Sequence, residues 1–292
     1  MTAYKPAYED AAPMTLSQPF RAVCACLLAL AIAGSPLAAA AQTADTPPLS
    51  TRTAAGDTVM AKAAHADWTR LLAKYVTASP DGITRVDYAA FAASAPDRAA
   101  LDAYIARFAE ADLSARTDAN FASWANLYNA VTVRYILEKY PVKSIKDGFL
   151  IGGPWKDIKL RAGGQEVSLD AIEHKILRKV WGTPEVHYAI NCASYSCPNL
   201  PQKAWEAATL AADLDQAARD YVNHARGVTV TAKGLTVSSI YDWFQADFGG
   251  SKEAVVAHLV KYAAPSLADD IRANPKIVRD SYDWSLNDIQ TP

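Results

Sequence analysis

The sequence predicts an α+β fold, a helix-rich single domain with a small, mainly antiparallel sheet. In the first part of the domain, apolar residues recur at helical spacing. Short alternating segments come later and flank Gly-containing turns, which is typical of hairpins. Helices therefore lead and hairpins follow, and this order favours α+β over the regular alternation that builds a parallel sheet.

Apolar spacing and turn residues assign the elements in order. Helices are expected around 68–76, 101–108, 120–139, 168–180, 205–223 and 253–262. Strands are expected at 83–88 and 186–190, and hairpins at 158–160 with 166–169 and at 228–231 with 235–237. No internal repeat or long linker divides these elements, so we assign residues 60–292 to one globular domain.

The N-terminus precedes this domain. Phe20-Arg21 is followed by an apolar run and then by an Ala-rich segment ending at Ala41, so residues 1–41 are predicted to be a secretory signal peptide. The run is too short to span a membrane. Residues 42–59 are rich in Thr, Ala, Pro and Ser, which predicts a flexible leader. We therefore expect a periplasmic or secreted protein without stable membrane insertion after signal cleavage.

Composition and motifs narrow the classes of partner. The chain has 292 residues, a formal net charge of −2 and no basic block, which argues against a nucleic-acid partner. The expected partner is an unidentified substrate or protein. No cofactor is expected, because the glycine-rich phosphate loops, HExxH and GxSxG are absent. No metal is expected either, because Cys192, Cys197, His174 and His187 lack a paired CxxC spacing.

Two asparagines lie on the predicted helix 120–139, which is apolar nearly all round and therefore predicted to be buried. Asn126 and Asn129 are three residues apart, so their side chains point the same way from a helix with little access to water. One interpretation is that they pair with buried backbone groups, because buried amides need partners. The other is that they orient a catalytic side chain or a substrate.

The predicted helix 168–180 has Ser168 as its N-cap and carries an acidic and a basic candidate. Glu173 falls near the centre of the apolar stripe, and His174 lies about a quarter-turn away. A carboxylate on a core face is costly unless it is paired, which makes Glu173 a functional candidate. The alternative for Glu173 is an ion pair with Arg134 or Arg178.

The stretch 186–200 reads VHYAINCASYSCPNL and holds both cysteines of the predicted mature protein. An apolar strand is expected to lead into this polar turn. In one interpretation Cys192 or Cys197 is a thiolate nucleophile that a histidine assists. On a straight strand His187 and Cys192 would face opposite sides, so the partner would be His187 after a turn at Asn191, or His174.

In the other interpretation Cys192 and Cys197 form a disulfide. Export favours this pairing. The loop is short, so the bond would restrict the unfolded chain little, and a reducible, redox-active bond is a further alternative. Five tryptophans of the domain are expected to pack as core and corner residues rather than bind ligands: Trp155, Trp181, Trp205, Trp243 and Trp284.

Five motifs occur in one order, and together they resemble the domain of unknown function 547 family across residues 118–287. They are WANLYNA (124–130), SLDAIEHKILR (168–178), HYAINCASYSCPNL (187–200), SSIYDWFQADFG (238–249) and YDWSLN (282–287). The resemblance implies that the two asparagines, Glu173-His174 and the cysteine stretch belong to one site. Some members of this family resemble fusions with thioredoxin- or glutaredoxin-like domains, and this favours thiol chemistry. A likeness to papain-like or transglutaminase-like enzymes is a fold-level analogy.

These observations lead to two hypotheses. The first is a cysteine-dependent hydrolase or acyl transferase with Cys192 as nucleophile and His187 or His174 as base. In it Asn126 and Asn129 are orienting or oxyanion groups, and Glu173 is the buried carboxylate. The second is a non-catalytic binding or structural domain, or a thiol-redox protein, with a Cys192–Cys197 disulfide.

Overall fold

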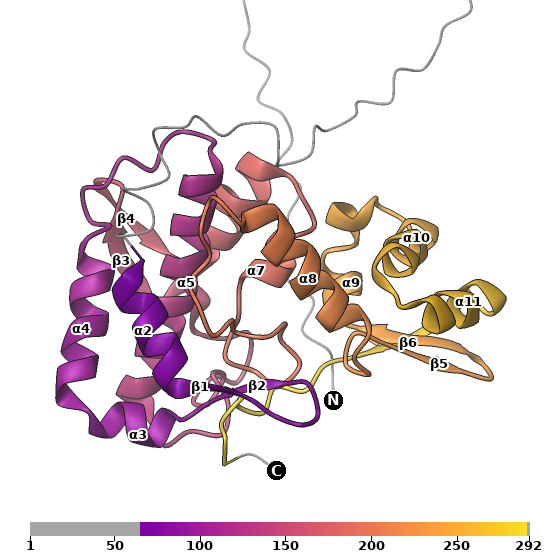
Figure 1. The fold of residues 1–292 in the computed structure, drawn as a ribbon, viewed down its shortest axis with the longest axis horizontal. Coiled ribbons are helices and arrows are strands. Elements are labelled where there is room, and N and C mark those ends of the chain that lie inside the picture. Colours follow the sequence, from indigo (N-terminus) through magenta and orange to yellow (C-terminus); the bar gives the residue numbers. More distant parts are fainter. Residues whose placement is uncertain (1–64, 291–292) are drawn as a thin grey trace, which may run out of the picture.

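A computed structural model describes residues 65–290. Helices dominate it, and three small sheets lie among them (Figure 1). The predicted α+β class is therefore confirmed. The predicted signal peptide (1–41) and leader (42–59) lie outside the described residues. No helix within the described part of the chain is both long and apolar enough to cross a membrane.

The elements of the first half are α2 (Ala66–Tyr75), β1 (Val76–Ala78), β2 (Thr84–Val86), α3 (Tyr88–Ala93), α4 (Ala95–Ala106) and α5 (Asp118–Lys139). They are followed by the 3-10 helix η2 (Pro154–Lys156), β3 (Lys159–Ala162), β4 (Gln165–Ser168), α6 (Leu169–Ala171), the π-helix η3 (Ile172–Trp181) and α7 (Val186–Ala189). The last part contains α8 (Leu210–Val222), β5 (Val228–Thr231), β6 (Gly234–Ser238), α9 (Ile240–Trp243), the 3-10 helix η4 (Gln245–Phe248), α10 (Lys252–Tyr262), α11 (Pro265–Ala273) and β7 (Ile277–Ser281).

The sheets are local hairpins with one addition. β1 pairs with β2, and β3 with β4, both antiparallel. β5 and β6 form the second predicted hairpin, and β7 joins β6 as a parallel neighbour. The predominance of antiparallel pairs is as predicted, and the parallel pair brings the C-terminal segment back across the molecule.

Two predicted strands differ from the structure. Residues 186–190 are not a strand, because the chain coils into α7 with backbone hydrogen bonds from His187 to Pro184 and from Tyr188 to Glu185. His187 and Cys192 therefore do not lie on opposite faces of one straight strand. The strand predicted at 83–88 ends at Val86, because Asp87 caps α3 by accepting a hydrogen bond from the Ala90 N–H.

Two predicted helices also differ. The helix expected from 205 begins only at Leu210. The helix capped by Ser168 forms, and Ser168 Oγ accepts a hydrogen bond from the Ala171 N–H at 3.1 Å. From Ile172 to Trp181 it is a π-helix, so angular positions based on 3.6 residues per turn do not hold there. Gly182, with φ of 62°, ends it in the left-handed region that favours glycine.

Two hydrophobic clusters form the core. The larger surrounds α5 with α2, α3, α4 and η3, and the smaller lies among α8, α9, α10 and the sheet β5-β6-β7. Figure 1 shows α2–α4 gathered at one end of the molecule and α10, α11, β5 and β6 at the other, with α7 between them. The segment after α7, which carries the cysteines, therefore lies where the two clusters adjoin.

Candidate functional site

The cysteine loop, residues 190–200, leaves α7 and contains Cys192 and Cys197. Their sulfur atoms lie at disulfide distance, and their Cα atoms are 6.3 Å apart, a spacing that a disulfide spans. Cys192 is half-buried, whereas Cys197 is only 4% exposed. A reagent that approaches from solvent therefore meets Cys192 first.

Asn129 on α5 anchors the entry to this loop. Its side-chain amide donates to the Ala189 carbonyl at 2.9 Å and accepts from the Asn191 N–H at 2.8 Å. Asn126 makes the same kind of double contact with the N–H and carbonyl of Trp205. Both asparagines thus pair with buried backbone groups, as the first of the two interpretations holds. Because Asn129 bonds to the residues on both sides of Ile190, it fixes the backbone directly before Cys192.

Asn191 then closes the loop on itself. Its amide donates to the Pro198 carbonyl at 2.7 Å, which ties together the two limbs that flank the cysteines. The side-chain oxygen of Asn191 accepts a hydrogen bond from the Ala193 N–H at 2.8 Å. Ala193 has a φ of 60°, the left-handed region that alanine rarely adopts. The Ala193 carbonyl also accepts from the Asn287 N–H at 3.0 Å, so hydrogen bonds on both sides of Ala193 hold this conformation.

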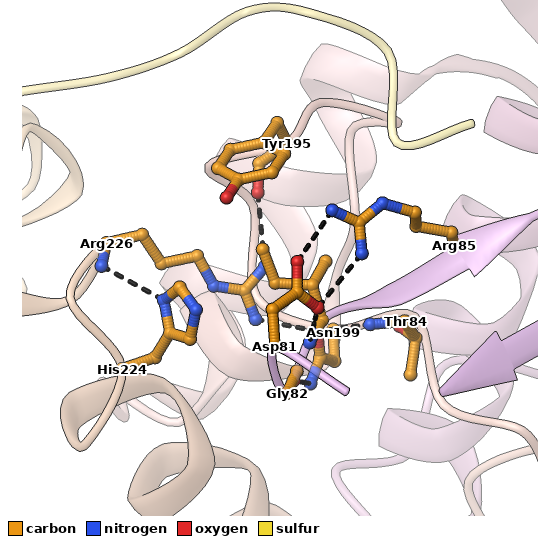
Figure 2. A network of polar contacts seen from close by, with 9 residues as sticks. Asp81, Gly82, Thr84, Arg85, Tyr195, Asn199, His224 and Arg226 are labelled. Atoms are coloured by element: carbon orange, nitrogen blue, oxygen red, sulfur yellow. Dashed lines mark hydrogen bonds and ion pairs between the residues drawn. The ribbon is translucent and has the colours of Figure 1, made fainter. Parts of the chain in front are cut away.

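A network of polar contacts connects Tyr195 and Asn199 of the loop to neighbouring segments (Figure 2). Asn199 accepts hydrogen bonds from the Thr84 N–H at 3.0 Å and from Arg226 at 2.6 Å, and Arg226 also donates to the Tyr195 carbonyl at 3.1 Å. Arg85 forms a two-point ion pair with Asp81, and its hydrogen bonds lower the pKa of Asp81 to about 2. The network ties the loop to β2 and to the turn that precedes β2.

Hydroxyl and amide groups surround the two sulfurs. The Cys192 N–H donates to Cys197 Sγ at 3.0 Å, and Tyr282 Oη lies 3.1 Å from Cys197 Sγ and 3.3 Å from Cys192 Sγ. Ser194 Oγ lies 3.2 Å from Cys192 Sγ and 2.8 Å from Tyr282 Oη. One of the two hydroxyl protons therefore lies between Ser194 and Tyr282, and the other is free to face a sulfur.

Tyr282 keeps its proton. Burial raises its pKa above the ordinary value, and the hydrogen bond with Ser194 and the positive charge of Arg226 only partly oppose this. The negative charge of Glu173 acts in the same direction as burial. Tyr282 is therefore a hydrogen-bond donor at neutral pH, next to the buried sulfur of Cys197.

Glu173 lies on the inner side of this site and is 9% exposed. Tyr128 on α5 donates a hydrogen bond to its carboxylate at 3.1 Å. Burial and the Glu173 charge raise the pKa of Tyr128 well above its usual range, so the phenol remains a donor. The alternative of an ion pair between Glu173 and an arginine is wrong, because Arg178 pairs with Asp247 and Arg134 with Glu138.

Four half-buried aromatic residues form what we call the aromatic shelf, namely Trp155, Trp243, Tyr282 and Trp284. The ring centroid of Tyr282 lies 4.6 Å from that of Trp284 and 4.9 Å from that of Trp243. Trp155 and Trp243 flank Trp284 at 5.7 Å and 5.6 Å. Trp155 and Trp284 pack against the larger hydrophobic cluster, and Trp243 and Tyr282 against the smaller one. The shelf therefore bridges the two clusters beside the cysteine loop.

The two candidate histidines belong to a different cluster. His187 Nε2 lies 2.7 Å from Asp247 Oδ2, and its ring stacks on Phe244 with centroids 4.3 Å apart. Arg178 donates to both oxygens of Asp247, and Arg178 Nη1 lies 2.9 Å from His174 Nδ1. Burial favours a higher pKa for Asp247, but its hydrogen bonds with His187 and Arg178 outweigh burial and hold the pKa well below the usual range.

The structure thus brings some predicted site residues together and separates others. Cys192, Cys197 and Asn129 meet at the loop, and Glu173 is close enough to affect the pKa of Tyr282. Asn126 holds Trp205 instead. Within residues 65–290, no imidazole is among the hydrogen-bond partners of either sulfur. The same residues contain no cluster of three or more His, Cys, Asp or Glu side chains suited to a metal ion.

Sequence reasoning missed several residues that the site contains. Tyr282 and Ser194 contact the sulfurs, Tyr128 binds Glu173, and Asp247 binds His187. Three of the five tryptophans expected in the core, Trp155, Trp243 and Trp284, are only partly buried. The signal was present in the motifs 238–249 and 282–287, which contain Asp247, Trp243, Tyr282 and Trp284 but were not assigned chemistry.

Comparison with known proteins supports the resemblance found in the motifs. Residues 112–222 match the model of a family described as "Protein of unknown function, DUF547". This match includes the motifs at 124–130, 168–178 and 187–200, and it ends before those at 238–249 and 282–287. No curated protein and no solved structure matches the chain.

Proposed function

With residues 112–222 belonging to the DUF547 family, whose function is unknown, we propose that the chain is an exported thiol–disulfide exchange protein. Its working group is the Cys192–Cys197 pair. One observation carries the proposal: the half-buried Cys192 faces solvent, while hydrogen-bond donors gather on the buried sulfur of Cys197.

The exchange runs in two steps. A thiolate of a partner attacks Cys192 Sγ; a sulfur–sulfur bond forms between the partner and Cys192, the bond to Cys197 breaks, and its electron pair stays on Cys197 as a thiolate. A second thiolate of the partner attacks the mixed disulfide and releases Cys192 as a thiolate. The partner gains a disulfide and the pair is reduced, and both thiolates equilibrate with protons from water. A disulfide-bearing oxidant of the exported compartment regenerates the pair.

The donors around Cys197 give the first step its direction. The Cys192 N–H at 3.0 Å and the Tyr282 hydroxyl at 3.1 Å stabilise negative charge on Cys197 when it leaves. A hydrogen bond to a charged group contributes about 1.5–3 kcal/mol. A better-stabilised leaving thiolate leaves faster. Cys192 is therefore the attacked sulfur and Cys197 the leaving group.

Trapping of mixed disulfides tests this assignment. The Cys197→Ala variant keeps the accessible sulfur and should form a stable mixed disulfide with glutathione disulfide, visible by intact mass. The matched Cys192→Ala variant, with only the buried sulfur, should form it at least ten-fold more slowly. When both cysteines are present, the single substitution Tyr282→Phe should slow reduction of the pair by about ten-fold, which corresponds to about 1.4 kcal/mol. A native pair that stays oxidised in excess dithiothreitol would overturn the proposal and leave a disulfide-shaped binding or structural domain.

A second candidate is a cysteine-dependent hydrolase or acyl transferase that uses reduced Cys192 to attack a carbonyl carbon. Glu173 favours it, because this buried carboxylate accepts a hydrogen bond from Tyr128 and contacts neither sulfur. Reduced protein incubated with an activated ester should then carry an acyl group on Cys192 that turns over, and Glu173→Gln should slow the turnover. Absence of an acyl adduct on the reduced protein removes this candidate and leaves thiol exchange intact.

A further inference from the structure

We propose that the aromatic shelf binds an extended polypeptide segment that carries the cysteine exchanged at Cys192, with an aromatic or large aliphatic residue near that cysteine. This inference rests on the proposed exchange function and names its substrate class. The partner is thus an unfolded or extended cysteine-containing polypeptide rather than a small thiol.

The aromatic shelf is not part of the buried core. Four other tryptophans are almost completely buried, namely Trp68, Trp124, Trp181 and Trp205, each at most 4% exposed. The rings of Trp155, Trp243 and Trp284 instead remain partly exposed while they contact one another. Lys146 Nζ lies 4.6 Å from the ring centroid of Trp284, so the shelf carries a cation beside its rings. Exposed aromatic surface of this kind marks interaction sites, and covering it releases roughly 25 cal/mol for each Å² removed from water.

The shelf adjoins the reacting sulfur. Tyr282 belongs to both, since its hydroxyl lies 3.3 Å from Cys192 Sγ and its ring contacts the rings of Trp243 and Trp284. An extended chain advances about 3.4 Å per residue. A polypeptide joined to Cys192 through its own cysteine would therefore place its next one or two side chains over the shelf.

The rings of the shelf favour an aromatic partner. Offset or edge-to-face aromatic contacts contribute about 0.5–1.5 kcal/mol beyond area burial, which favours aromatic side chains in the partner. A polypeptide can carry both the apolar side chain that these rings would bury and the cysteine that the proposed exchange at Cys192 requires.

Binding can be tested without exchange. The probe is a short peptide in which serine replaces the cysteine and phenylalanine lies beside it; a matched peptide has alanine in place of phenylalanine. Each peptide is titrated into oxidised protein, and binding is followed by the change in tryptophan fluorescence. The phenylalanine peptide should have a dissociation constant at least ten-fold lower than that of the alanine peptide. Trp284→Ala and Trp243→Ala should abolish this preference, and Trp284→Phe should retain it. Val278→Ala, a half-exposed apolar position on β7, serves as the control and should bind as the wild type does.

Exchange rates separate this inference from the proposed function. For each variant we compare the reduction rate by a phenylalanine-cysteine peptide with that by glutathione, and we expect the ratio to exceed ten in the wild type and to fall toward one in Trp284→Ala. A ratio of one in the wild type, with rapid exchange, would overturn the polypeptide-binding inference alone. The inference would also be overturned if, by tryptophan fluorescence, a soluble oligosaccharide bound with a lower dissociation constant than the phenylalanine peptide. Binding of the serine peptide without exchange by any thiol would support the shelf and overturn the proposed exchange.

Discussion

Asn129 accepts a hydrogen bond from the Asn191 N–H at 2.8 Å, so the central helix α5 fixes the residue that directly precedes Cys192. The same amide group donates to the Ala189 carbonyl, which also accepts from Trp205 Nε1. A fully buried side chain from the core thus sets the position of a half-buried sulfur. The position of the cysteine pair therefore depends on the packing of α5.

Replacement of Asn129 by alanine should destabilise the protein by about 1–3 kcal/mol, because it leaves the Asn191 N–H without its buried partner. Urea unfolding measures the loss, and intact-mass kinetics should show a changed rate of reduction of the cysteine pair. The control is Asn223→Ala. Asn223 makes a similar double contact with the Ala264 N–H and the Tyr262 carbonyl at the end of α10, and neither of these residues belongs to the cysteine loop. If Asn223→Ala changed the reduction rate as much, Asn129 would have no specific role at the loop.

Ala193 provides a test of backbone conformation. At a φ of 60°, alanine bears a left-handed cost of about 1–2 kcal/mol. Glycine relieves this cost but loses about 0.5–1 kcal/mol through the freedom it gains in the unfolded chain. Ala193→Gly should therefore change the free energy of unfolding by less than about 1 kcal/mol. Ala193→Val should cost at least about 3 kcal/mol, because the site is fully buried and disfavours a branched side chain. Equal losses in chemical denaturation would contradict this account.

Asp247 should be important for stability. The Asp247→Asn variant removes the charge that pairs with Arg178 and accepts a hydrogen bond from His187. The pair is partly buried, and loss of hydrogen bonds to a charged group should cost about 1.5–3 kcal/mol. The matched control is Asp215→Asn, whose exposed pair with Arg219 should contribute less than about 1 kcal/mol. Thermal and urea unfolding measure both. A loss below 1 kcal/mol for Asp247→Asn would show that the cluster is not energetically coupled.

His258 should make stability depend on acid. Burial, with the charges of Lys261 and His187, lowers the pKa of His258 from 6.5 to about 3. The unfolded chain then binds the proton more readily than the folded one, so this contribution is complete above pH 6.5 and is lost as pH falls toward 3. By pH 5 the loss is about 2 kcal/mol. The free energy of unfolding of His258→Phe should fall less between pH 7.5 and 5 than that of the wild type. Identical pH profiles would contradict the prediction.

The sequence predicted local features better than contacts between distant segments. Helical spacing located α5, and the Lys233-Gly234 turn located its hairpin, because both depend on neighbouring residues. Residues 186–190 were assigned to a strand on apolar composition alone, although no partner strand was available and the chain coils there. The cysteine pair and Asn129 could be named from type and burial. The contact of Tyr282 with Cys197 could not, because these residues are 85 positions apart and only the folded chain brings them together.

The segment after β7 contributes to the site from far along the chain, and this affects the order in which the site forms during folding. After β7 it supplies Tyr282, then Asn287, which accepts a hydrogen bond from Tyr88 across 199 positions, and finally Asp288, which bridges to Val86 on β2 (Figure 1). Contacts between such distant residues form late in folding. Until the segment after β7 docks, Cys192 and Cys197 therefore lie without Tyr282 beside them. The pair acquires this hydroxyl neighbour only in the late, long-range stage of folding.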